Sequence, residues 1–127
     1  MIVGLGTDIA DIARVTKVYN STGQGFVDRI LTESEKEKLP TNSKLIPAYL
    51  AKRFAMKEAA AKALGTGIAD GVSFQDFKTV HDAAGAPTLE LSGRAKELAQ
   101  QKNITHWHVS LSDEKSYAVA TVIAESN

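Results

Sequence analysis

The feature that most constrains the fold is an alanine-rich stretch from Pro47 to Leu64, which contains seven alanines and no glycine. Alanine loses no side-chain entropy in a helix, so this composition predicts one long helix. Pro47 suits a first helical position because its missing N–H would have no helical partner there. A Gly-Thr-Gly sequence at 65–67 follows directly and predicts the end of the helix.

Shorter elements flank this helix. An apolar run with two glycines predicts a strand over residues 2–8, and apolar residues spaced by three and four predict a helix from Ile9 to Tyr19. Thr32 followed by Glu35 is a capping-box pattern. We also expect helices at 26–31 and 92–101, and strands at 72–80, 88–91, 106–112 and 117–124. The sequence thus predicts an α+β fold, a mainly antiparallel sheet packed against helices, in a single domain spanning residues 1–127.

Composition excludes several classes of protein. The chain has 127 residues, and its 15 basic and 15 acidic residues cancel, which argues against wholesale nucleic-acid binding. It has no cysteine, so disulfides, iron–sulfur clusters and thiolate zinc sites are excluded. No apolar run approaches the roughly 18 residues of a membrane span, and no basic leader precedes the first strand. We therefore expect a cytoplasmic protein that binds neither nucleic acid nor membrane.

Glu58 and Lys62 lie one helical turn apart on the long helix. Such a pair can be a solvated surface pair that merely stabilises the helix. Lys62 also lies one turn before Gly65, Thr66 and Gly67, where a lysine beside backbone donors would suit a phosphate or pyrophosphate. A simple helix C-cap explains the glycines equally well.

Asp8 ends the first predicted strand, and it can cap the helix that follows or supply an oxygen to a hard cation. Magnesium takes one or two carboxylates and completes its coordination with water and substrate phosphate. Asp8 and Glu58 together would fit that pattern.

The strand at 106–112 alternates, with polar side chains on one face. His106 and His108 alone make a poor zinc site because a third ligand is missing. His108 and Ser110 could contact an anion or a nucleotide, or could simply lie on a solvent-exposed face of the sheet. No serine lies in a nucleophile-elbow motif, so a catalytic triad is not indicated.

These segments together resemble the short, single-domain holo-acyl-carrier-protein synthase class of 4′-phosphopantetheinyl transferases. The similarity rests on Gly-Thr-Asp-Ile at 6–9, on Arg-Phe-Ala-Met-Lys-Glu-Ala-Ala-Ala-Lys-Ala-Leu-Gly-Thr-Gly at 53–67, and on shorter matches at 73–74, 85–87 and 108–112. It covers nearly the whole chain, and the long-helix motif is its most specific part.

The resemblance implies an enzyme that transfers 4′-phosphopantetheine from coenzyme A to a serine of apo-acyl-carrier protein in fatty acid biosynthesis, releasing adenosine 3′,5′-bisphosphate. It implies catalytic roles for Asp8, Glu58 and Lys62, with Mg²⁺ held by Asp8 and Glu58. The residues implied to contact coenzyme A are Arg53, Lys62, Gly65, Thr66, Gly67, Pro87, His108 and Ser110. It also implies a homotrimer with active sites between subunits.

Charge suggests where the partner docks. Acyl-carrier proteins are strongly acidic, and Arg14 lies with Lys17 on the face of the early helix that we expect to be exposed. Two other functions stay open on the residues alone. One is a non-catalytic module that binds coenzyme A or a carrier protein, and the other is a small metal-dependent pyrophosphate hydrolase.

Overall fold

The structure, a computed structural model, describes residues 1–127. In chain order the elements are β1 (Ile2–Asp11), α1 (Ile12–Thr22), α2 (Gln24–Ile30), α3 (Glu33–Lys36), η1 (Ser43–Leu45), α4 (Ile46–Leu64), η2 (Phe74–Asp76), β2 (Phe77–His81), β3 (Pro87–Leu91), α5 (Gly93–Gln101), β4 (Ile104–Asp113) and β5 (Tyr117–Ser126). The expected α+β class and antiparallel pairing are confirmed. The strands form two sheets rather than one, with orders β1-β5-β4 and β2-β3.

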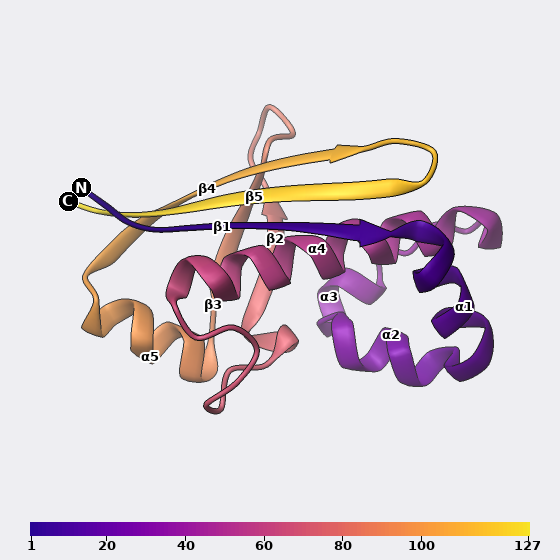
Figure 1. The fold of residues 1–127 in the computed structure, drawn as a ribbon, viewed down its shortest axis with the longest axis horizontal. Helices are drawn as coiled ribbons and strands as arrows, with labels where there is room; N and C mark the ends of the chain where they lie inside the picture. The colour runs from indigo at the N-terminus through magenta and orange to yellow at the C-terminus, as the bar shows by residue number, and fades with distance from the viewer.

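The long helix α4 packs beneath the three-stranded sheet (Figure 1). Two glycines of β1 permit this approach. A Cβ at Gly4 would lie 1.8 Å from the Ala63 carbonyl oxygen, and one at Gly6 would lie 1.9 Å from the Ala59 carbonyl oxygen. Alanines of α4 form the other side of the contact and are buried. Small side chains therefore bring the strand and the helix backbones together.

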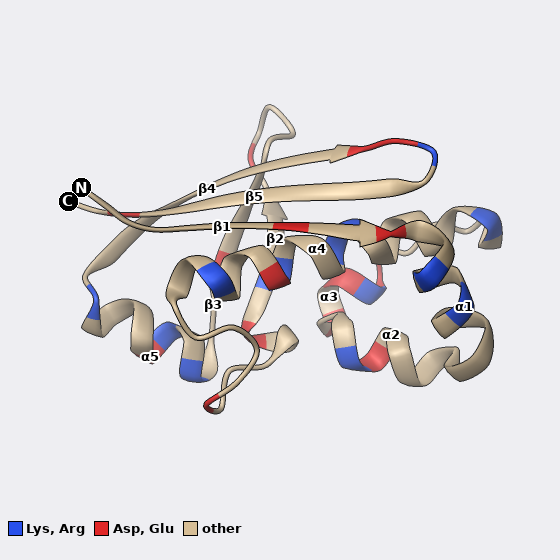
Figure 2. Cartoon of the chain, viewed as in Figure 1, with Lys and Arg blue, Asp and Glu red and all other residues tan.

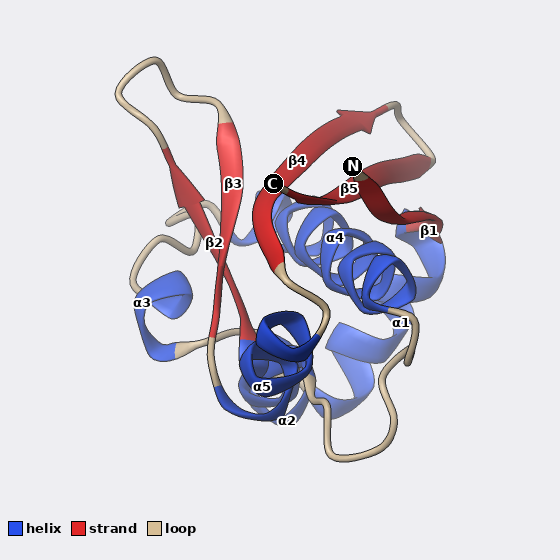
Figure 3. Cartoon of the chain, turned by 90° about the vertical axis from the view of Figure 1, so that its left-hand side faces the viewer, coloured by secondary structure: helices blue, strands red, loops and turns tan.

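The remaining elements enclose the other sides of α4. Figure 3 shows α4 between the three-stranded sheet and α2, with the β2–β3 hairpin to one side. Helix α5 follows the hairpin and leads into β4. Its first turn is capped by Asp76 of η2, whose Oδ2 accepts from the Ala95 N–H at 3.1 Å.

Two local predictions are wrong. Ile9 belongs to β1 and not to a helix, because β1 stays paired with β5 as far as Asp11 opposite Tyr117. Asp11 then caps α1 by accepting from the Ala13 N–H at 2.9 Å. The strand expected from Val72 begins only at Phe77, because Ser73 and Asp76 form a capping box that folds residues 74–76 into a 3-10 turn.

The other expected elements are present. The helix predicted from Pro47 to Leu64 is α4, with Pro47 in its first turn and Gly65 in the left-handed conformation at φ 98°. Thr32 and Glu35 form the capping box of α3. None of the helices is both long and apolar enough to cross a bilayer.

Candidate active site

Asp8 of β1 and Lys62 of α4 meet beside the edge of the sheet. Lys62 Nζ lies 3.1 Å from Asp8 Oδ1 and donates to the Thr7 carbonyl oxygen at 2.9 Å. The Asp8 side chain is only 17% exposed, whereas that of Lys62 is 49% exposed. The second carboxylate oxygen of Asp8, Oδ2, is buried and has no hydrogen-bond partner. The pair therefore leaves one buried acceptor available to a ligand.

Glu58 lies one turn before Lys62 on α4 and shares this environment. Partial burial raises the pKa of Glu58, and the negative charge of Asp8 raises it further, while Lys62 and Arg29 oppose the shift. Two carboxylates that repel each other in this way favour a cation between them. Asp8 and Glu58 are thus the residues that can hold a divalent metal ion.

The donor set fits magnesium better than a transition metal. The chain gathers no group of three or more histidine, cysteine, aspartate or glutamate side chains that could hold an ion alone. Magnesium keeps several positions for water and substrate phosphate oxygens, so two carboxylates suffice. Lys62 lies beside them as a second positive charge for such oxygens.

The backbone donors after α4 are not free. The N–H groups of Gly65, Thr66 and Gly67 all donate to the Ala61 carbonyl oxygen, at 3.1, 3.2 and 3.1 Å. The ammonium of Lys102 additionally caps the Leu64 carbonyl oxygen. This turn is therefore a helix C-cap, which the sequence allowed as the alternative to a phosphate-binding loop. Any contact it makes with a nucleotide must use surfaces other than these three N–H groups.

His108 and Ser110 lie on the opposite face of the sheet from Asp8. In the strand register Asp8 is opposite Ala120, which is buried against α4, whereas Ser110 is opposite the neighbouring residue Thr121. Both residues are exposed, and His108 Nε2 lies 2.9 Å from Glu125 Oε1. The structure does not bring them to the Asp8–Lys62 pair within one chain.

Arg53 and Pro87 also lie away from that pair. They line an open cavity of about 390 Å³ with Ser110, between the N-terminal half of α4, the hairpin and β4. Arg53 is nine residues before Lys62, so the two side chains leave α4 on opposite sides. The expected site residues therefore form two groups, one around Asp8 and one around this cavity.

A buried ion pair between α3 and α4 has no counterpart in the sequence predictions. Lys57 Nζ lies 2.6 Å from Glu35 Oε1, and the two side chains are 0% and 3% exposed. Lys57 also donates to the Ile30 carbonyl oxygen at 2.6 Å. Burial alone would raise the pKa of Glu35, but the Lys57 charge and hydrogen bonds from Lys57, Thr32 and Thr79 outweigh it and lower that pKa. The capping-box pattern at Thr32 located the helix, but nothing in it indicated that Glu35 would be buried.

Comparison with known proteins identifies the family of the chain. The family model described as the 4′-phosphopantetheinyl transferase superfamily matches residues 4–122, which include Asp8, Glu58 and Lys62. The chain belongs to this superfamily. The phosphopantetheinyl transferase resemblance predicted from the motifs is thus confirmed, and the chain is an enzyme of this class.

Similar members of the superfamily cover the whole length of the chain. A holo-[acyl-carrier-protein] synthase of Photobacterium profundum is 60% identical over 98% of both chains. The crystal structure of the Neisseria meningitidis synthase has a TM-score of 0.89 at 42% identity, covering 99% of this chain and 100% of the other. A Bacillus anthracis synthase, solved in complex with coenzyme A (3′,5′-ADP), has a TM-score of 0.80 at 39% identity, covering 100% and 99%.

Proposed function

We propose that this transferase moves 4′-phosphopantetheine from coenzyme A to a serine of apo-acyl-carrier protein, with Mg²⁺, in the fatty acid biosynthesis of the cytoplasm. The observation that carries the proposal is the convergence of Asp8 and Lys62, at 3.1 Å, with Glu58 one turn away. The similarity to synthases named for this reaction, one of them bound to coenzyme A, supports the choice of substrates.

The reaction is a phosphoryl transfer in which the serine oxygen forms a bond to the β-phosphorus of coenzyme A. The bond from that phosphorus to the bridging oxygen breaks, and adenosine 3′,5′-bisphosphate leaves with the electron pair. Negative charge grows on the phosphoryl oxygens and the leaving group, and the Lys62 ammonium stabilises it. The serine proton passes to Glu58 directly or through water, and the raised pKa of Glu58 suits a base.

Asp8 orients the site in two ways. Its Oδ1 holds the Lys62 ammonium, and its partnerless Oδ2 would bind the magnesium ion together with Glu58. When bound, magnesium would supply Lewis-acid polarisation of the pyrophosphate oxygens. Removing either carboxylate should therefore weaken both metal binding and turnover.

We further propose that the active site is shared between copies in a homotrimer. The outer face of the three-stranded sheet exposes apolar side chains, with Leu5 and Ile9 more than 60% exposed. Val119 lies opposite Ile9 and is 38% exposed, so these residues form one apolar strip. Because His108 lies away from Asp8 within one chain, a neighbouring copy would have to supply His108, Ser110, Pro87 and Arg53 to a coenzyme A molecule bound at Lys62.

The carrier protein would dock on α1. This helix carries exposed Arg14 and Lys17 and no acidic residue, and Figure 2 shows its basic segments. Arg14 also borders a small apolar cavity of about 130 Å³ with Phe26 and Phe54. Phe54 lies one turn before Glu58, so a carrier held here by charge and an apolar side chain could present its serine to the site.

The mass of the carrier protein tests the proposal. Apo-carrier incubated with the enzyme, coenzyme A and Mg²⁺ should gain the mass of one phosphopantetheine group, and a chelator should prevent the gain. An unmodified carrier with tightly bound coenzyme A would instead identify a binding module. Release of 4′-phosphopantetheine without any carrier would identify a pyrophosphate hydrolase.

A further inference from the structure

The C-terminal end of α4 is covered by a side chain from another element. Helix α5 lies beside this end of α4, and Lys102 closes α5 (Figure 1). The Lys102 ammonium donates to the carbonyl oxygen of Leu64, the last residue of α4. It also lies over Gly65, because a Cβ added there would be 2.9 Å from Lys102 Nζ. Lys102 thus brings a positive charge to the turn that ends α4.

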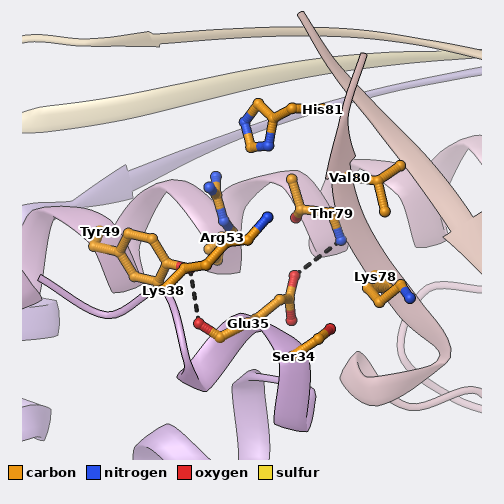
Figure 4. A pocket seen from close by; sticks show the side chains of 9 residues that line it. All are labelled: Ser34, Glu35, Lys38, Tyr49, Arg53, Lys78, Thr79, Val80 and His81. Carbon is orange, nitrogen blue, oxygen red and sulfur yellow. Dashed lines mark hydrogen bonds between the residues drawn. The ribbon is translucent and has the colours of Figure 1, made fainter. Parts of the chain in front are cut away.

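The charge of Lys102 is not neutralised by the rest of the chain. The lysines of α4 each have a carboxylate within 4.0 Å, from Asp113, Glu35 and Asp8. Arg53 has no such partner, but it stacks on the ring of Tyr49, with its Cζ 4.7 Å from the ring centroid (Figure 4). Lys102 forms neither kind of contact. An ammonium has three N–H donors, so the bond to Leu64 leaves donors and the charge of Lys102 available to a ligand.

Lys102 also lies in line with the candidate active site. Gly65 follows Lys62 by three residues and Glu58 by seven, and both spacings return to nearly the same side of a helix. The side of α4 that carries Glu58 and Lys62 therefore continues to Gly65, where the Lys102 ammonium lies. This places the charge of Lys102 about one helical turn beyond Lys62.

The backbone of the turn after α4 is poorly suited to hold an anion by itself. The N–H groups of Gly65, Thr66 and Gly67 all donate to the Ala61 carbonyl oxygen. The C-terminal end of a helix also carries a partial negative charge of roughly half an elementary charge, which repels phosphate oxygens. The Lys102 ammonium offsets that charge and supplies the N–H donors that the backbone lacks.

We infer that Lys102 is a further substrate-binding residue, whose ammonium holds an anionic phosphate oxygen of the donor substrate at the C-terminal end of α4. The inference rests on the proposed function, which makes coenzyme A that donor. Lys102 takes no part in the transfer step, which uses Glu58 and Lys62. It therefore sets the affinity for coenzyme A and leaves the rate of the chemical step unchanged.

Transfer assays at several ionic strengths, giving kcat and the KM for coenzyme A, test the inference. Lys102→Gln removes the charge but keeps an N–H donor for the Leu64 carbonyl oxygen, whereas Lys102→Arg keeps both. The matched control, Lys96→Gln, removes one charge from the exposed side of α5. We expect Lys102→Gln to raise the KM about fivefold at low salt, with kcat unchanged and a weaker dependence on salt. Lys102→Arg and Lys96→Gln should behave as the wild type does.

An unchanged KM in Lys102→Gln, or an equal rise in Lys96→Gln, would overturn the inference, since a residue that only caps α4 affects stability and not affinity. Calorimetric titration of coenzyme A into the carrier-free protein separates this inference from the proposed function. The dissociation constant should rise by the same factor in Lys102→Gln. A wild type that shows this difference in binding but transfers nothing to the carrier would refute the proposed function alone. A wild type that binds no coenzyme A would refute both.

Discussion

The substitution Gly6→Ala should damage both the fold and the active site, although it adds only one methyl group at a position without chemistry. The new Cβ would lie 1.9 Å from the Ala59 carbonyl oxygen and 2.8 Å from the Ala63 nitrogen. A carbon–oxygen contact needs about 3.3 Å, so β1 must withdraw by roughly 1.4 Å from α4. Neither obstacle can rotate away, because both are helix backbone atoms. We therefore expect a loss of about 3 kcal/mol, the upper end for an overpacked core.

The same withdrawal would separate Asp8 from Lys62. Their contact is 3.1 Å, near the limit of a hydrogen bond, so a shift of β1 on this scale breaks it. Urea unfolding measures the stability, and steady-state transfer to the carrier measures kcat/KM. Both should fall together.

Gly25→Ala is the matched control. No atom lies within 4 Å of a Cβ at Gly25, and the residue is within α2, where alanine is the better helix former. It should stabilise the protein by about 0.5–1 kcal/mol and leave kcat/KM unchanged. A Gly6→Ala protein as stable and active as the wild type would refute the close strand–helix contact.

Five further predictions concern the site, its support and the assembly of copies. Glu58→Gln and Lys62→Ala should each lower kcat/KM at least ~100-fold in the transfer assay, and near-normal rates would contradict their roles. Burial and the charge of Asp8 raise the pKa of Glu58, so ionising this side chain destabilises the metal-free fold. The metal-free Glu58→Gln protein should therefore melt at the same temperature as the wild type or higher at pH 7, and a lower melting temperature would contradict this account of Glu58. Lys57→Met leaves Glu35 buried without its cation and should lower the free energy of unfolding by about 3–5 kcal/mol in urea; a loss below ~1 kcal/mol would contradict the pair. The pKa of Glu35 is lower in the folded protein than in the unfolded chain, so the ionised side chain stabilises the fold. This stabilisation is complete above the ordinary glutamate pKa of about 4.3 and is lost as the pH falls through the folded-state pKa. Acid titration of the wild type should therefore show a loss of stability that Lys57→Met lacks. Leu5→Glu places a charge on the apolar strip and should reduce the particle size in sedimentation velocity; an unchanged size would contradict assembly through that face.

Local signals in the sequence were enough to predict the helices with strong helix propensity or a clear cap. Alanine content, Pro47 and Gly65 located α4, and the Thr32 capping box located α3, because each depends on neighbours within a few residues. Ile9 was assigned to the wrong element because its spacing to the following apolar residues fits a helix, while pairing with Val119, far along the chain, keeps it in β1.

The site was predictable in its residue types but not in its geometry. The family motif indicated Asp8, Glu58 and Lys62, yet only the fold brings β1 to α4. The glycines at 4 and 6 marked a strand, but their packing on helix carbonyls depends on tertiary contact. Lys57 belongs to the family motif on α4, but its burial against Glu35 could not be recognised from spacing alone.

The central claim is that Asp8 and Glu58 bind one divalent ion beside Lys62. Titration of Mn²⁺ into the coenzyme A complex, followed by electron paramagnetic resonance, tests it most directly. The account predicts one tight Mn²⁺ per chain in the wild type and its loss in both Asp8→Asn and Glu58→Gln. Tight binding of one Mn²⁺ in both variants would contradict it.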